Sequence, residues 1–170
     1  MKLSTLRDLY VEELKDLYSA ETQILRALPN MARAAESAEL RDAFQEHEHQ
    51  TREQVRRLEQ IFDGLNTDSK GKVCKGMQGL IAESAEFLEE EPDPCLMDAG
   101  LISLAQRVEH YEMAGYGSVR TYAQELGLTE QAELLQATLD EETEADRRLT
   151  ALAEQGINAR ADAEEEAVIL

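Results

Sequence analysis

Proline and cysteine are scarce in this sequence of 170 residues, which contains three prolines and two cysteines. The β-branched runs typical of strands are also missing, whereas residues of good helix propensity such as Ala, Leu, Glu, Gln and Arg dominate. Cys74 and Cys95 lie outside any C-x-x-C spacing, which indicates neither a disulfide framework nor a zinc knuckle. These absences favour an all-α protein whose thiols are buried or idle.

Long apolar runs are missing as well. No stretch of about 18 apolar residues is available to span a bilayer. The start of the chain, Met1-Lys2-Leu3-Ser4, lacks the apolar segment of a secretory signal. We therefore expect a cytoplasmic protein that does not have a membrane as its partner.

Basic residues are outnumbered, with 17 Lys and Arg against 36 Asp and Glu and a formal net charge of -19. The resulting field repels nucleic acid and anionic membrane surfaces, so we expect neither as a partner. The same field would concentrate cations near the surface. An acidic coat that keeps the protein soluble explains the charge equally well, so charge alone does not predict a metal site.

Apolar residues recur at intervals of three and four residues in four long segments, which is typical of helices with one buried face. A shorter helix is expected between a polar loop and the break at Pro92 and Pro94. Gly64 is predicted to end the second helix in the left-handed conformation. The expected long helices cover residues 4–37, 40–64, 94–126 and 129–156, and the shorter one covers residues 77–90.

This order of elements predicts a ferritin-like four-helix bundle, built from two antiparallel hairpins that are joined through a short crossover helix. The bundle domain is expected to span residues 1–156, and residues 157–170 are predicted to form a flexible acidic tail. Periodicity leaves open another helical bundle with the same connectivity.

Polar residues interrupt the apolar stripe of every long helix. In the first helix, for example, Glu21 occupies a position between Leu17 and Ile24 where an apolar residue is expected. Each interruption falls near the middle of its helix, so in an antiparallel bundle all four would lie at the same height. The candidate metal ligands at these positions are Glu21, His47, Gln54, Glu109, Glu112 and Glu142.

Several buried carboxylates must be protonated, paired with bases or bound to a cation, because an unpaired buried charge costs several kcal/mol. Few basic side chains are expected on these faces, so the pattern predicts two Fe or Mn ions bridged by Glu. The alternative is that the buried face of each helix is assigned one residue out of register, in which case these acids face the solvent. Glu46-x-x-His49 also has the spacing of the Glu-x-x-His motif that binds metal in di-iron bundles, but its helix face is predicted to be exposed to solvent. His110 is expected to lie beside the metal ligands or on the surface.

Three segments carry a resemblance to a known family. They read YSAETQ at residues 18–23, CKGMQGLI at 74–81 and VEHYEMAGYG at 108–117, and a similar block follows at 138–150. These segments resemble the YciE/YciF family of bacterial stress proteins, and the resemblance covers about residues 3–155.

The resemblance implies a ferritin-like fold, a homodimer, a dinuclear metal centre and a role in stress responses, with manganese-dependent catalase activity suggested for some members. Glu21, Gln54, Glu112 and Glu142 match the family positions proposed for that centre. One departure concerns Gln50, which stands where the family usually has an acid.

The leading functional hypothesis is therefore a metal-binding stress protein that consumes peroxide in the manner of a catalase. A metal-free structural or interaction protein, in which the acids are protonated or paired across a dimer, is the alternative from another class. An iron-storage cage is the third hypothesis, although a single sequence reveals no cage contacts.

Overall fold

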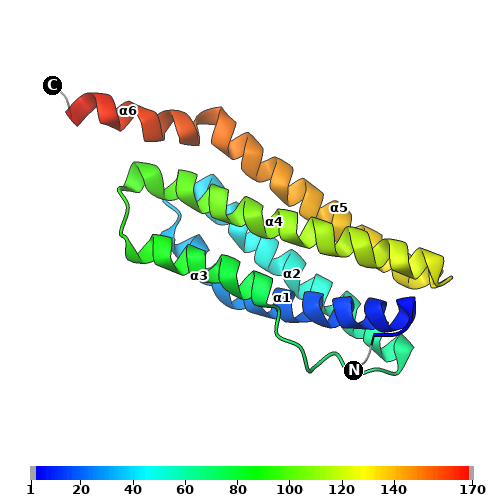
Figure 1. Cartoon of the computed structure of the whole chain (residues 1–170). Coiled ribbons are helices and arrows are strands. Elements are labelled where there is room, and N and C mark those ends of the chain that lie inside the picture. Colours follow the sequence, from blue (N-terminus) through cyan, green and yellow to red (C-terminus); the bar gives the residue numbers. More distant parts are fainter. Residues whose placement is uncertain (1–2, 169–170) are drawn as a thin grey trace.

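A computed structural model describes the backbone of residues 3–168 and the side chains of residues 3–163 (Figure 1). Within these residues the chain forms helices and no strands, which confirms the predicted all-α class. The elements are α1 (Leu6–Ala34), α2 (Ala38–Leu65), α3 (Lys75–Glu89), α4 (Pro94–Glu125), α5 (Thr129–Leu152), the π-helix η1 (Ala153–Ile157) and α6 (Asn158–Val168).

The four long helices pack around one shared interior. α1 packs against α2 and α4, and α5 packs against α4 and α2, so each long helix has two long neighbours. The shorter α3 packs beside α1 and α4 (Figure 1). The arrangement brings the middle segments of α1, α2, α4 and α5 together, while the specific ferritin-like assignment remains a prediction.

The helix boundaries follow local sequence signals. Thr5 and Asp8 form a reciprocal capping box at the start of α1, where each side chain accepts a hydrogen bond from the other's backbone N–H. Pro94 occupies the first turn of α4, where its missing N–H costs nothing. The predicted end of α2 at Gly64 is wrong, because the left-handed residue is Asn66 with φ 50°. Asparagine tolerates this conformation better than most residues.

The end of the chain differs from the irregular tail expected from residue 157 onward. Gly156 has φ 152° within η1, and the chain then continues as the helix α6, which contacts α4. Alanine and glutamate dominate α6, and both have high helix propensity. Residues 169–170 of the predicted tail lie outside the described residues, and the flexibility of the segment remains a prediction.

The outer surface is mostly polar. Among the described residues, the exposed large apolar side chains are those of Leu3, Val73 and Leu96. None of the described helices combines the length and the apolar composition that a membrane span requires. Burial of apolar side chains inside the helical assembly is therefore the main stabilising contribution.

Two apolar clusters fill the interior at opposite ends of the long helices. One contains Ile24, Phe44 and Leu149, and the other contains Leu14 and Leu58. Every long helix contributes to both clusters, and the polar interruption of its stripe falls at or beside the boundary between the two contributions. The interior thus has a polar layer between two apolar layers.

Candidate metal centre

All six predicted ligand residues lie in this polar layer and are buried. Their exposed fractions are 0% for Glu21, Gln54, Glu112 and Glu142, 2% for Glu109 and 5% for His47. One comes from α1, two from α2, two from α4 and one from α5. The expectation that these side chains point inward is confirmed, whereas their action as ligands remains a prediction.

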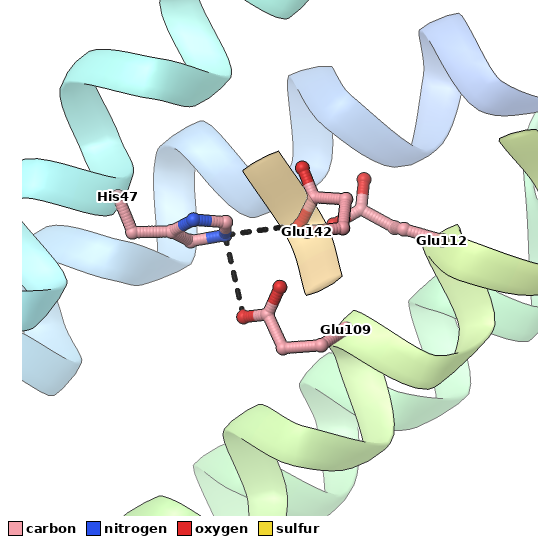
Figure 2. Close-up of side chains that lie close together, drawn as sticks. All are labelled: His47, Glu109, Glu112 and Glu142. Atoms are coloured by element: carbon pink, nitrogen blue, oxygen red, sulfur yellow. Dashed lines mark ion pairs between the residues drawn. The ribbon is translucent and has the colours of Figure 1, made fainter. Parts of the chain in front are cut away.

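Four of the six come together as one group, which consists of His47, Glu109, Glu112 and Glu142 (Figure 2). Each offers one ligand atom, and these four atoms all lie within 4.8 Å of one another. His47 Nε2 lies 3.4 Å from Glu109 Oε1 and 4.0 Å from Glu142 Oε2. This spacing leaves room for one ion among an imidazole and three carboxylates.

The remaining two, Glu21 and Gln54, adjoin the group without belonging to it. The Tyr116 hydroxyl donates a hydrogen bond to Glu21 Oε1, so one oxygen of this carboxyl group is already engaged. Gln54 Nε2 donates to Glu142 Oε1 and, at 3.2 Å, to Glu141 Oε2. Gln54 therefore orients the Glu142 carboxyl group, whereas Glu21 is itself held by Tyr116.

Many polar atoms in this layer have no hydrogen-bond partner, although buried polar atoms almost always have one. Both oxygens of Glu112 and both ring nitrogens of His47 are unpartnered. The other unpartnered atoms of the six residues are Glu21 Oε2, Gln54 Oε1, Glu109 Oε2 and Glu142 Oε2. The donor set therefore fits a bound cation, because a cation would coordinate several of these lone pairs at once.

The electrostatics of the layer disfavour four ionised carboxyl groups. Burial raises the pKa of Glu21, Glu112 and Glu142 well above the value of a free glutamate. The charge of Glu142 raises the pKa of Glu21 further, whereas His47 opposes the rise at Glu142. Burial also raises the pKa of Glu109 to about 7, although a hydrogen bond with Glu142 lowers this pKa in part. The centre must therefore take up protons or a positive ion.

One arginine, Arg57, lies beside the centre, in keeping with the expectation that few bases are available. Arg57 donates two hydrogen bonds to Glu141, of 2.6 and 2.7 Å, and a third of 3.2 Å to Thr138 Oγ1. Its charge lowers the pKa of Glu21 only as a minor effect, because Glu141 already pairs with it. Arg57 therefore leaves most of the centre's negative charge uncompensated.

Local sequence explains how the side chains reach one place. Glu109 and Glu112 are three residues apart and so share one face of α4. Gly115 lies next on the same helix, and a Cβ atom there would come within 2.7 Å of Leu17 Cδ2. The missing side chain thus permits the close approach of α1 and α4, whereas a Cβ atom at Gly117 would have no such neighbour within 4 Å.

The histidines and acids that the sequence placed outside the centre do lie outside it. Glu46 and His49, which have ligand spacing on α2, are both exposed. The His110 side chain is 66% exposed, and its Nε2 lies 3.3 Å from Asp146 Oδ1 at the surface. His47 and His49 therefore differ completely in environment, although they are only two residues apart.

Comparison with known proteins places the chain in a family. Residues 5–162 match the family described as a domain of unknown function, DUF892. Protein YciF of Escherichia coli (strain K12) is 40% identical over 163 residues, which cover 95% of this chain and 98% of YciF. The chain belongs to the DUF892 family. The suspected resemblance to the YciE/YciF family is thereby confirmed.

Solved structures of DUF892 relatives agree with this membership. The crystal structure of the E. coli stress protein YciF matches with a TM-score of 0.88 and 41% identity, covering 92% of this chain and 99% of YciF. YcfI of Rhodopseudomonas palustris, provisionally described as a structural protein, matches with a TM-score of 0.85 and 37% identity, over 88% and 95% of the two chains.

Gln50, where the resemblance implies an acid, has a definite place in the structure. Gln50 is half-buried and lines a cavity of about 460 Å³ together with His47 and Glu109 of the four-residue group. An acid at this position would therefore face the same cavity as the candidate ligands. The amide removes one negative charge from the wall of that cavity.

Tyr116 and Arg57 are further contacts of the candidate centre, and of these two only Arg57 was missed in the sequence. Tyr116 lies four residues after Glu112, so its helical spacing alone places it on the same face of α4. Arg57 lies three residues after Gln54 and is another such neighbour. Its pairing with Glu141 depends on the packing of α2 against α5, which sequence spacing does not reveal.

Proposed function

We propose that this protein is a ferritin-like, metal-binding stress protein whose centre holds two Fe or Mn ions and consumes peroxide. The observation that carries the proposal is the group of His47, Glu109, Glu112 and Glu142, with unpartnered polar atoms inside an otherwise apolar interior. Hard carboxylate oxygens combined with one imidazole suit iron and manganese.

The donor set supports more than one ion. The four-residue group provides the ligands of the first ion. Glu21 Oε2 and Gln54 Oε1 are buried and unpartnered, so they are available to a second ion beside it. Both oxygens of Glu112 lack hydrogen-bond partners, so this carboxylate would be able to hold both ions.

A bound pair of redox-active ions would supply the electrons for peroxide disproportionation, in which two molecules of H₂O₂ give one O₂ and two H₂O. The chain itself contributes orientation and protection from water. Tyr116 holds one oxygen of Glu21, and Gln54 holds one oxygen of Glu142, so neither carboxylate is free to rotate. The surrounding apolar layers keep bulk water away from both.

Elemental analysis of the purified full-length protein tests the metal half of the proposal. We expect about two Fe or Mn per chain, and loss of metal in Glu21→Ala, Glu112→Ala and His47→Ala. His49→Ala is the matched control, because it removes an exposed imidazole from the same helix and should leave the metal content unchanged. Retention of metal in His47→Ala would reject the assigned ligand set.

An oxygen electrode tests the enzymatic half separately. The metal-loaded protein should evolve O₂ from H₂O₂, and the His49→Ala control should do so at the same rate. Stoichiometric metal without oxygen evolution would reject the catalase-like activity and leave metal binding intact.

A metal-free structural protein is the second candidate, and two observations favour it. Hydrogen bonds from Tyr116 to Glu21 and from Gln54 to Glu142 can form without any metal when the carboxyl groups share protons. In addition, the related YcfI of R. palustris is provisionally described as structural. Absence of stoichiometric transition metal after gentle purification would favour this candidate over the first.

A further inference from the structure

The cavity of about 460 Å³ joins the buried centre to the surface between α2 and α5. Its buried wall includes His47 and Glu109, which are 5% and 2% exposed. Its rim is made by exposed charged residues of the same two helices. The lining residues are Asp42, Ala43, Phe44, Glu46, His47, Gln50, Glu109, Glu144, Ala145, Arg148 and Leu149.

The cavity ends on polar atoms that lack hydrogen-bond partners. Neither ring nitrogen of His47 has a hydrogen bond, and Glu109 Oε2 has none either. Unpartnered buried groups at the closed end of a cavity are the arrangement that a bound ligand would complete. The cavity is therefore a route to ligand atoms and not only a surface depression.

The rim carries an excess of negative charge. Asp42, Glu46 and Glu144 are exposed acids, and Arg148 is the single basic residue in the lining. Acidic clefts raise the local concentration of cations and increase their association rates. Dissolved divalent cations would therefore be drawn towards this rim, whereas a neutral molecule such as H₂O₂ would be unaffected by its charge.

A second cavity touches Glu109 from the side of α1 and α3, but it does not suit a hydrated ion. It measures only about 20 Å³, which is room for about one water molecule. Apart from Glu109 and Ser84, its lining is apolar, with residues such as Ile24, Leu28 and Ile81. A cation would lose its hydration there without gaining ligands.

We propose that the cavity between α2 and α5 is the path by which divalent cations reach the centre, with Asp42, Glu46 and Glu144 attracting them and Arg148 opposing them. This inference depends on the metal centre proposed above. It adds the route and the electrostatic control of loading, which the ligand set by itself does not specify.

The rate of Mn²⁺ association with the metal-free, full-length protein tests the rim. The triple variant Asp42→Asn, Glu46→Gln, Glu144→Gln should bind Mn²⁺ about 3- to 10-fold more slowly at low ionic strength, with unchanged final stoichiometry. The matched control neutralises three exposed acids at the end of α3 and at its C-cap, a segment that lines no part of this cavity: Glu86→Gln, Glu89→Gln and Glu90→Gln. Arg148→Gln should accelerate binding, and salt near 0.5 M should reduce all these differences.

The variant Ala145→Phe tests whether Mn²⁺ passes through the cavity itself, because it changes the width of the cavity without changing its charge. Ala145 is half-buried in the wall, so a larger side chain there would narrow the cavity. Binding and release of Mn²⁺ should both slow by similar factors, because an obstruction changes rates without changing affinity. Far-ultraviolet circular dichroism would verify that the variant is folded.

The possible outcomes are distinct. Equal association rates for the rim triple and the α3 triple would overturn the proposed path, even if Mn²⁺ binds stoichiometrically. Failure of the unmodified protein to bind stoichiometric Mn²⁺ would overturn the metal centre itself, and the path with it. Slower binding in the rim triple alone, together with slower release in Ala145→Phe, supports the proposal.

Discussion

Replacement of Glu112 by leucine should stabilise the metal-free protein while it abolishes metal binding. Glu112 is fully buried, and neither of its carboxyl oxygens has a hydrogen-bond partner. A buried polar group without partners costs roughly 1–3 kcal/mol. Leucine has a similar size and no polar atoms, so Glu112→Leu removes that cost and extends the two apolar layers towards each other.

The size of the effect can be stated as a melting temperature. For a chain of this length, 1 kcal/mol corresponds to roughly 2–4 °C. Glu112→Leu should therefore raise the melting temperature of the metal-free protein by roughly 2–12 °C. Glu133→Leu is the control, because Glu133 is exposed on α5 and its replacement should change stability by less than about 0.5 kcal/mol.

Metal should reverse the order of stability. At a free metal concentration of 1,000 times its Kd, a ligand that binds only the folded protein adds about 4.1 kcal/mol, which exceeds the gain expected from the leucine substitution. The unmodified protein gains this stabilisation and Glu112→Leu does not. Thermal unfolding followed by circular dichroism, once with EDTA and once with Mn²⁺, measures both effects.

A destabilised Glu112→Leu variant in EDTA would refute the reasoning. A loss of more than about 1 kcal/mol would mean that the Glu112 carboxyl group makes favourable interactions in the metal-free protein. That result would favour the metal-free structural candidate over the metal centre.

The remaining predictions concern affinity, pH and assembly. Gln50→Glu should increase Mn²⁺ affinity several-fold in isothermal titration calorimetry, because it adds a carboxylate beside His47, whereas Gln45→Glu on the exposed face of α2 should not. The metal-free protein should lose stability as pH rises from about 4.5 through 7, because burial raises the pKa of Glu109 to about 7 and only its neutral form is favoured when folded. Urea unfolding at pH 5 and pH 8 measures this loss, and an equal slope in Glu109→Gln would contradict it. Light scattering after size-exclusion chromatography should give a homodimer, and a cage-sized mass would favour iron storage instead.

Much of the fold was predictable because the apolar residues repeat with the helical period. That period predicted the five main helices to within a few residues, and the structure confirmed the all-α class. The end of α2 was misplaced because both Gly64 and Asn66 can adopt the left-handed conformation. The helix at residues 158–168 was missed because its polar composition provides no apolar stripe.

The inward direction of the six candidate residues was also predictable. Glu21, Glu109, Glu112 and Glu142 each interrupt an apolar stripe, and a residue within a stripe must face the interior whatever its chemistry. The separation of Glu46 and His49 from the centre followed from the same pattern. Helical phase thus distinguished the buried His47 from the exposed Glu46 and His49 within one short segment of α2.

By itself, the sequence determined the class of fold, the phase of each helix and the burial of the polar layer, because all three depend on the local spacing of residues along one helix. Only the tertiary structure decided which ligand atoms meet within 4.8 Å, and that Glu21 pairs with Tyr116 instead of joining them. It also decided that a cavity reaches His47 and Glu109 between α2 and α5. These features depend on the separation and rotation of neighbouring helices, which are set by packing between side chains that are distant in the sequence.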